Sequence, residues 1–341
     1  MKTFRFSLVA LAATALITAC SDEAVVEQRL ITSEAQEISF RLQGGTPETR
    51  AMATTIDNID AFVVYGTDSV ANVAGTNIFD GVTVARQKGT GAIFDYNPKK
   101  YYSAEIGKAA FIAYSPVSAS LNISGLDATS LLTTTSFDYV VNAPDGSGEA
   151  VQEDLLVAGK SVAVPSVAKV DLNFKHALSR IFVKAKNSLK ENVVITGLTL
   201  KNLYSEGTIT GTPASPAWTW AWSNYSNITS YDYVLARTGV AVKAGVTTAT
   251  LVTSMEQGMM VLPQEIVNSG DDHTAGDFAL EVTYDVANLT AQKAYVYLAD
   301  TYPFEYNTQY AITIEFSGTD LIEIGFTIDV AGFDDDPATM P

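Results

Sequence analysis

One cysteine is the side chain whose chemistry the sequence defines most clearly. The chain has 341 residues and a single cysteine, Cys20. A lone thiol cannot form an intrachain disulfide, a thiolate zinc site or a redox pair. It follows basic Lys2 and Arg5 and an apolar stretch at 6–17, the layout of an export signal that is too short to cross a membrane comfortably. We therefore expect residues 1–20 to be a signal peptide that ends at a reactive sulfur.

The residues around Cys20 indicate how that sulfur is used. Leu16-Ile17-Thr18-Ala19-Cys20 resembles the bacterial lipobox, whose cysteine receives lipid and becomes the new N-terminus. Several acyl chains, palmitate among them, would hold the protein firmly, since each buried methylene contributes ~0.8 kcal/mol. Ser21-Asp22-Glu23 resembles the signal that sends Bacteroidota lipoproteins to the outer face of the cell outer membrane. We expect a lipoprotein with an acidic linker at 21–35; the alternative is an ordinary signal peptide followed by a spare thiol.

Few side chains could serve as nucleophiles or metal ligands. His176 ends an expected strand, which favours a hydrogen-bonded structural role. His273 lies in the acidic loop 270–277, where oxygen ligands could hold calcium, but the spacing lacks an EF-hand pattern and favours a solvated loop. Paired carboxylates for glycoside hydrolysis leave no sequence signature. The sequence therefore assigns no catalytic, cofactor-binding or metal residue.

Three tryptophans form the most concentrated aromatic feature. Trp218, Trp220 and Trp222 alternate, so they share one face of a strand. Such a face can stack on a sugar or a partner, and it can equally pack in a core or along a hairpin. Both interpretations stay open from the sequence.

The charge balance excludes one class of partner. The chain has 38 acidic and 21 basic side chains and a formal net charge of −17. Such a field repels phosphate backbones and anionic lipid headgroups. We expect no nucleic-acid partner.

Alternation with a period of two residues dominates the chain after residue 36, and it indicates an all-β protein. In the first such segment Ile38, Phe40 and Leu42 point to one face. Further alternating segments lie at 109–114, 168–174, 181–185, 193–200, 248–252, 278–284, 294–298 and 310–316. Segments 310–316 and 322–330 read as a long hairpin with one apolar face, which requires a second sheet and so predicts a sandwich.

The length suggests two domains. A polar run at 184–192 is the natural boundary. We expect an N-terminal β-sandwich at 36–186, a C-terminal β-sandwich at 193–333 and an acidic tail at 334–341.

Four local patterns together resemble the fimbrillin superfamily of Bacteroidota, whose Mfa-like members build type V pili. They are FIAYSP at 111–116, EDLLVA at 153–158, VDLNFKHALSRIFV at 170–183 and MMVLPQ at 259–264. Their order and spacing match across residues 36–333. One departure is Phe333, which stands where family members often have a tryptophan.

The resemblance implies two tandem transthyretin-like β-sandwiches, no enzymatic activity and no cofactor. It implies a pilus (fimbria) subunit that is cut after an arginine by a trypsin-like, gingipain-type protease. The cut removes a first strand, here Ile38, Phe40 and Leu42, and a strand from another pilus subunit fills the gap. Arg50, followed by Ala51, lies in a loop with Gly44, Gly45 and Pro47 just after that strand, and such loops are favoured sites of proteolysis.

The residues that follow the last strand favour a tip or accessory subunit over a stalk subunit. Three aspartates and two prolines at 334–341 make a poor donor strand, because buried acids are costly and proline cannot donate to a ladder. The alternative function is a surface-anchored lipoprotein that binds a host or other glycan through the tryptophan face and does not polymerise.

Overall fold

The computed structural model describes residues 36–43, 59–70, 73–88, 93–102, 107–119, 121, 133–142, 152–163, 169–215, 217–232, 239–253, 258–270, 272–298, 301–318 and 323–333. Strands are the only long regular elements in these segments, so the prediction of an all-β fold is confirmed. Within the same segments, no helix has the length and apolar character needed to cross a membrane.

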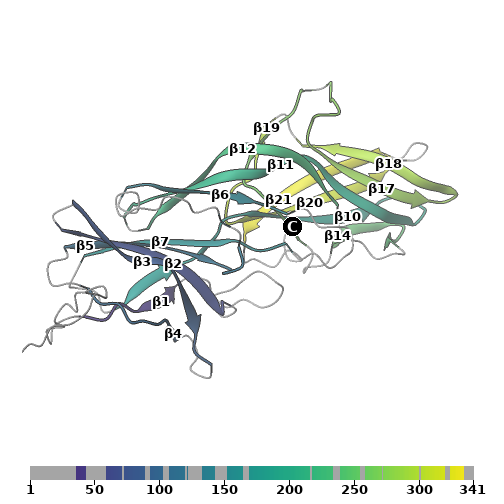
Figure 1. The fold of residues 1–341 in the computed structure, drawn as a ribbon. Helices are drawn as coiled ribbons and strands as arrows, with labels where there is room; N and C mark the ends of the chain where they lie inside the picture. The colour runs from purple at the N-terminus through teal and green to yellow at the C-terminus, as the bar shows by residue number, and fades with distance from the viewer. Residues whose placement is uncertain are drawn as a thin grey trace, which may run out of the picture. The chain divides into compact units, whose positions relative to one another are not determined.

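The first group of strands forms a six-stranded and a two-stranded sheet (Figure 1). The larger sheet is antiparallel and has the order β4 (Phe94–Asp95), β3 (Val73–Arg86), β2 (Ala61–Val70), β5 (Lys108–Ser115), β7 (Leu156–Ala163) and β9 (Lys175–His176). The smaller sheet pairs β1 (Phe40–Gln43) with β8 (Val170–Asn173) in parallel. One cluster of buried side chains contains residues of both sheets, so the two pack as layers.

The second group contains a five-stranded and a six-stranded sheet. The first has the order β14 (Val246–Leu251), β10 (Ser179–Asn187), β20 (Thr308–Ser317) and β21 (Glu323–Gly332), with β15 (Met259–Val261) also paired to β10. The other has the order β12 (Thr219–Asp232), β11 (Val193–Thr212), β17 (Ala279–Val286) and β18 (Leu289–Tyr297), with β13 (Val240–Val242) and β6 (Thr135–Val140) paired to β11. A short pair joins β16 (Glu265–Val267) to β19 (Thr301–Pro303).

A second buried cluster lies between these larger sheets. Ile312 and Ile314 of β20 are fully buried. On β11, Leu198 is 1% exposed and Leu200 is fully buried. All four belong to the same cluster. The sheet that contains β20 and the sheet that contains β11 are thus two layers of a β-sandwich (Figure 1), as the apolar face of 310–316 predicts.

The expected hairpin near the end of the chain is confirmed. β20 and β21 pair antiparallel from Thr308 opposite Gly332 to Ser317 opposite Glu323. However, β21 is the last strand of its sheet, so its apolar residues are only partly covered: Phe326 is 38% exposed and Val330 56% exposed.

Strand pairing crosses the polar run that the sequence suggests as a boundary. β10 lies in the segment assigned to the first sandwich, yet it pairs in parallel with β20 and antiparallel with β14. β6 likewise pairs with β11. The division into domains at 36–186 and 193–333 stays a prediction. The signal peptide, the linker at 21–35 and the tail at 334–341 lie outside the described residues.

Candidate functional site

The first described strand is the candidate site of strand exchange, and its backbone is paired at both of its ends. The amide of Ile38 donates to the carbonyl of Lys100 at 2.9 Å, and the amide of Tyr102 donates to Gln36 at 3.0 Å. From Phe40 to Gln43 the strand pairs in parallel with β8, residue for residue. In the described part of the chain, β8 is the only strand that forms a ladder with β1.

The alternation of residues 38–42 decides which side chains enter the core. Ile38 is 0% exposed, Phe40 5% and Leu42 9%, while Arg41 between them is exposed. The sequence-based expectation that these three apolar residues share a buried face is therefore met by their burial. That this strand is displaced during pilus assembly stays a prediction from the sequence.

Phe40 lies at the centre of a cluster of aromatic rings from the opposing sheet. Its ring centroid is 5.3 Å from Phe79, 5.7 Å from Phe111, 6.0 Å from Tyr96 and 6.1 Å from Phe62. These distances lie in the range of favourable edge-to-face pairs. Removal of the strand would therefore uncover rings from β2, β3 and β5 together.

Gly66 explains how two of these rings fit against the sheet. A Cβ atom at this position of β2 would lie 2.7 Å from Cδ1 of Phe111 and 3.2 Å from Cδ2 of Phe79. Only a residue without a side chain leaves room for both rings. The packing of Phe40 therefore depends on a glycine as well as on the surrounding aromatic rings.

Ion pairs link the exposed side chains of residues 37–41 to neighbouring segments. Arg41 binds both carboxylate oxygens of Asp171 on β8, at 2.7 and 2.9 Å, and these hydrogen bonds lower the pKa of Asp171. Lys99 bridges Glu37 at 2.6 Å and Asp95 at 2.5 Å, and its hydrogen bonds to these two acids raise its pKa. All are solvent-exposed pairs, which contribute little to stability. Burial of the apolar face therefore holds the strand.

The burial energy is large relative to the stability of a domain. Each fully buried large apolar side chain contributes ~1.5–3 kcal/mol, so the three together contribute about 5–9 kcal/mol. Typical domains are stable by ~5–15 kcal/mol. A fold that loses this strand has to refill the groove or lose much of its stability.

The processing residues cannot be compared with this geometry. Arg50 and Ala51 lie between β1 and β2, outside the described residues, and so does the lipidation residue Cys20. Each stays a prediction from the sequence.

The three tryptophans pack over glycines. Trp218 is 7% exposed, and a Cβ atom on Gly159 would lie only 2.3 Å from its ring. Trp220 is 6% exposed and is paired with Gly211 across the β11–β12 ladder. These two indoles therefore have almost no free surface. Trp222 is half-buried and also lies over a glycine, since a Cβ on Gly207 would stand 3.2 Å from its Cε3. The geometry favours packing for the first two and leaves only the third with a face open to a ligand.

His176 has the structural role that its position predicts. It is 5% exposed, its Nδ1 lies 2.9 Å from Oδ1 of Asp154, and its ring stacks on Phe333 with centroids 3.8 Å apart. Phe333 is itself 1% exposed. In the segments that the structure describes, no group of three or more His, Cys, Asp or Glu side chains could hold a metal ion.

The fold is similar to that of a solved fimbrial protein. A fimbrial protein from Bacteroides vulgatus matches with a TM-score of 0.62 and 14% identity, over 88% of this chain and 99% of that chain. A putative cell adhesion protein from Bacteroides uniformis matches with a TM-score of 0.48 and 15% identity, over 88% and 98% of the two chains. The tip fimbrial protein Mfa3 from Porphyromonas gingivalis, truncated at its C-terminus, matches with a TM-score of 0.45 and 10% identity over 86% and 99%.

Sequence comparison supplies the family. No curated protein matches the chain. A family model described as fimbrillin-like matches residues 49–329, which is most of the chain, and the chain therefore belongs to the fimbrillin-like family.

Proposed function

We propose that this protein is a structural and adhesive pilus subunit, not an enzyme, and that it joins other subunits by exchange of its first strand. The observation that carries the proposal is the packing of Phe40. Its strand, within the described segments, forms a ladder only with β8, and its ring covers aromatic rings of three other strands. Membership of the fimbrillin-like family and the fold shared with a fimbrial protein support it.

The proposed sequence of events follows from the energetics. A cut after Arg50 separates residues 36–43 from β2, so that only non-covalent contacts hold the first strand. Loss of the strand exposes an apolar groove and an unpaired edge of β8, and such edges recruit strands from other chains. The incoming strand restores the burial that Ile38, Phe40 and Leu42 supplied.

Protease treatment tests the processing step. A trypsin-like, arginine-directed protease should trim the purified full chain so that it begins at Ala51, and it should leave a resistant core. The Arg50→Ala variant should resist trimming at that place and should fail to assemble. Arg29→Ala, a change in the linker, is the matched control and should be trimmed like the natural chain. Identical trimming and assembly of Arg50→Ala would show that the processing hypothesis is wrong.

Before processing, the protein is proposed to be held in the outer membrane through Cys20. Cells that express the natural sequence should incorporate labelled palmitate into the protein, because the lipobox residues precede the only thiol. The Cys20→Ala variant has no acceptor sulfur and should carry no label. Equal labelling of the two proteins would refute the anchor.

We further propose a tip or accessory position. A stalk subunit must donate a strand as well as accept one. β21 pairs with β20 over its whole length, so it is already used inside the subunit. Residues 334–341, with three aspartates and two prolines, are poorly suited to a ladder.

Removal of residues 334–341 tests the position in the pilus. The shortened protein should fold and should be incorporated as the natural chain is, because the deleted residues supply no donor strand. Incorporation into surface pili, followed by immunoblotting of purified filaments, measures the effect. Abolished incorporation would contradict the tip assignment, and so would long filaments formed by the cut protein alone.

A further inference from the structure

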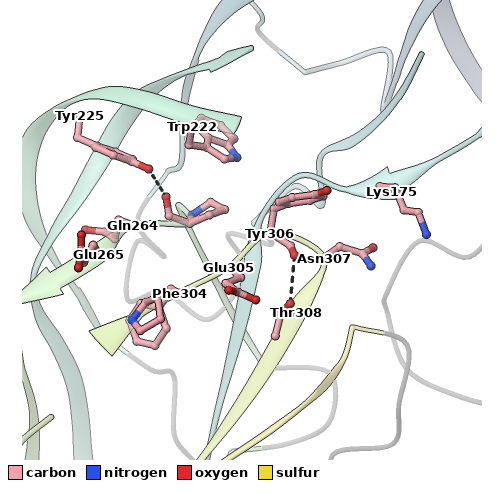
Figure 2. A pocket seen from close by; sticks show the side chains of 12 residues that line it. Lys175, Trp222, Tyr225, Gln264, Glu265, Phe304, Glu305, Tyr306, Asn307 and Thr308 are labelled. Carbon is pink, nitrogen blue, oxygen red and sulfur yellow. Dashed lines mark hydrogen bonds between the residues drawn. The ribbon is translucent and has the colours of Figure 1, made fainter. Parts of the chain in front are cut away.

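A pocket with a cavity volume of about 610 Å³ lies away from the first-strand groove. Its walls come from four segments: β9, β12, residues 263–265 at the start of β16, and residues 303–308 from the end of β19 to the start of β20. The volume falls within the ~300–1,000 Å³ that is usual for small-molecule sites. Figure 2 shows the side chains of these four segments that line the pocket.

Aromatic rings line one side of the hollow and are held in place by their polar atoms. Nε1 of Trp222 donates to the carbonyl of Ala177 at 2.7 Å, and the hydroxyl of Tyr225 donates to the carbonyl of Pro263 at 2.6 Å. Both rings, and Tyr306 near them in Figure 2, are half-buried. Because their polar atoms are already bonded, Trp222 and Tyr225 offer mainly the faces of their rings to a ligand.

Charged side chains also line the pocket. Lys175, Glu265 and Glu305 are exposed at the pocket, and in the described part of the chain their charged groups have no hydrogen-bond partner. The side chain of Gln264, by contrast, is fully engaged with the backbone of Tyr204 and Leu262. The pocket thus offers a ligand two carboxylate acceptors, Glu265 and Glu305, and one ammonium donor, Lys175.

The side-chain amide of Asn307 adds a second donor, and hydrogen bonds hold this residue in place. Its amide N–H donates to Leu178 at 3.1 Å, and its Oδ1 accepts the N–H of His176 at 3.1 Å. The residue has φ 55°, a left-handed conformation that asparagine tolerates better than most residues. With Oδ1 occupied by the backbone, the Nδ2 group is the part of this side chain that is left for a ligand.

We propose that this pocket binds a neutral saccharide. A sugar hydroxyl both donates and accepts, so it can use the carboxylates of Glu265 and Glu305 as well as the donors of Lys175 and Asn307. The C–H face of a pyranose ring complements the negative face of an aromatic ring. A polyamine carries donors but no acceptors, so it would leave Lys175 and Asn307 unpaired, and an acidic glycan is repelled by a chain with a net charge of −17.

This inference goes beyond the proposed assembly role, and the uncut, unassembled full chain is sufficient to test it. The purified chain is applied to an array of glycans that end in glucose, galactose, mannose or N-acetylglucosamine, with sialylated glycans, sulfated glycans and immobilised spermine on the same surface. The proposal expects retention on at least one neutral class and none on the acidic glycans or spermine. Retention on no neutral glycan, or equally on spermine or acidic glycans, overturns it.

Variants then assign the binding to this pocket. The methyl glycoside of the retained sugar is titrated by calorimetry into Trp222→Ala and into Glu305→Gln, whose side chain is exposed and isosteric, so that folding is preserved. Each change should weaken binding by on the order of tenfold or more, because it removes a ring face or a charge-assisted hydrogen bond. Tyr295→Ala, which removes a 47% exposed ring on β18 outside the pocket, is the control and should bind normally. Unchanged binding by Glu305→Gln and Trp222→Ala, or equal loss in Tyr295→Ala, overturns the assignment.

Discussion

Replacement of Phe40 with alanine should lower the free energy of unfolding by about 3–5 kcal/mol, the usual cost of truncating a buried phenylalanine. The large value is expected because this ring contacts four aromatic rings and has 5% of its surface exposed. Chemical denaturation of the uncut protein measures the change. Hydrogen exchange should locate it, with faster exchange in β2 and β5 and little change in β20.

Arg41→Ala is the matched control for Phe40→Ala. It alters the same strand, but its side chain is exposed and its ion pair with Asp171 is solvent-accessible. The effect on unfolding should be small. If Phe40→Ala is as mild as this control, the first strand is not an important part of the core, and the energetic argument for exchange fails.

Phe333→Ala should also destabilise the fold by about 3–5 kcal/mol, the range for loss of a fully buried aromatic ring. Phe333 is 1% exposed, stacks on His176 at 3.8 Å and lies 5.7 Å from the guanidinium of Arg180. Its loss uncovers a buried histidine that pairs with Asp154. Thermal and denaturant unfolding curves measure the change.

Val330→Ala provides the comparison for Phe333→Ala. This residue lies three positions earlier in the chain, on β21, and is 56% exposed. Truncation of an exposed valine on an edge strand should leave stability nearly unchanged. Similar losses in both variants would contradict a specific contribution from the buried ring of Phe333.

Alternation in the sequence predicts the parts of the fold that have one buried face. Ile38, Phe40 and Leu42 read as a half-buried strand, and their side chains are buried in the structure. The β20–β21 hairpin is predictable for the same reason. The strand β2 is harder to predict, because Phe62, Val63 and Val64 are consecutive and all buried, which removes the period of two.

Long-range pairing and sites built from several segments leave no such pattern. The parallel pairing of β10 with β20 joins residues more than a hundred positions apart, and nothing local specifies it. The pocket at Trp222 likewise combines four separate segments. For the tryptophans, the glycines at 159 and 211 are the signal that could have indicated packing, since each leaves space for one indole.

The N-terminal residue of the chain in surface filaments is the sharpest test of processing and strand exchange. Filaments are sheared from cells, purified, checked by electron microscopy and analysed by N-terminal sequencing and intact mass. Processing at Arg50 followed by strand exchange predicts a chain that begins at Ala51 and lacks Ile38, Phe40 and Leu42. A strand from another subunit then fills the groove. Filaments whose subunits retain residues 36–43 behind a lipidated Cys20 would contradict it.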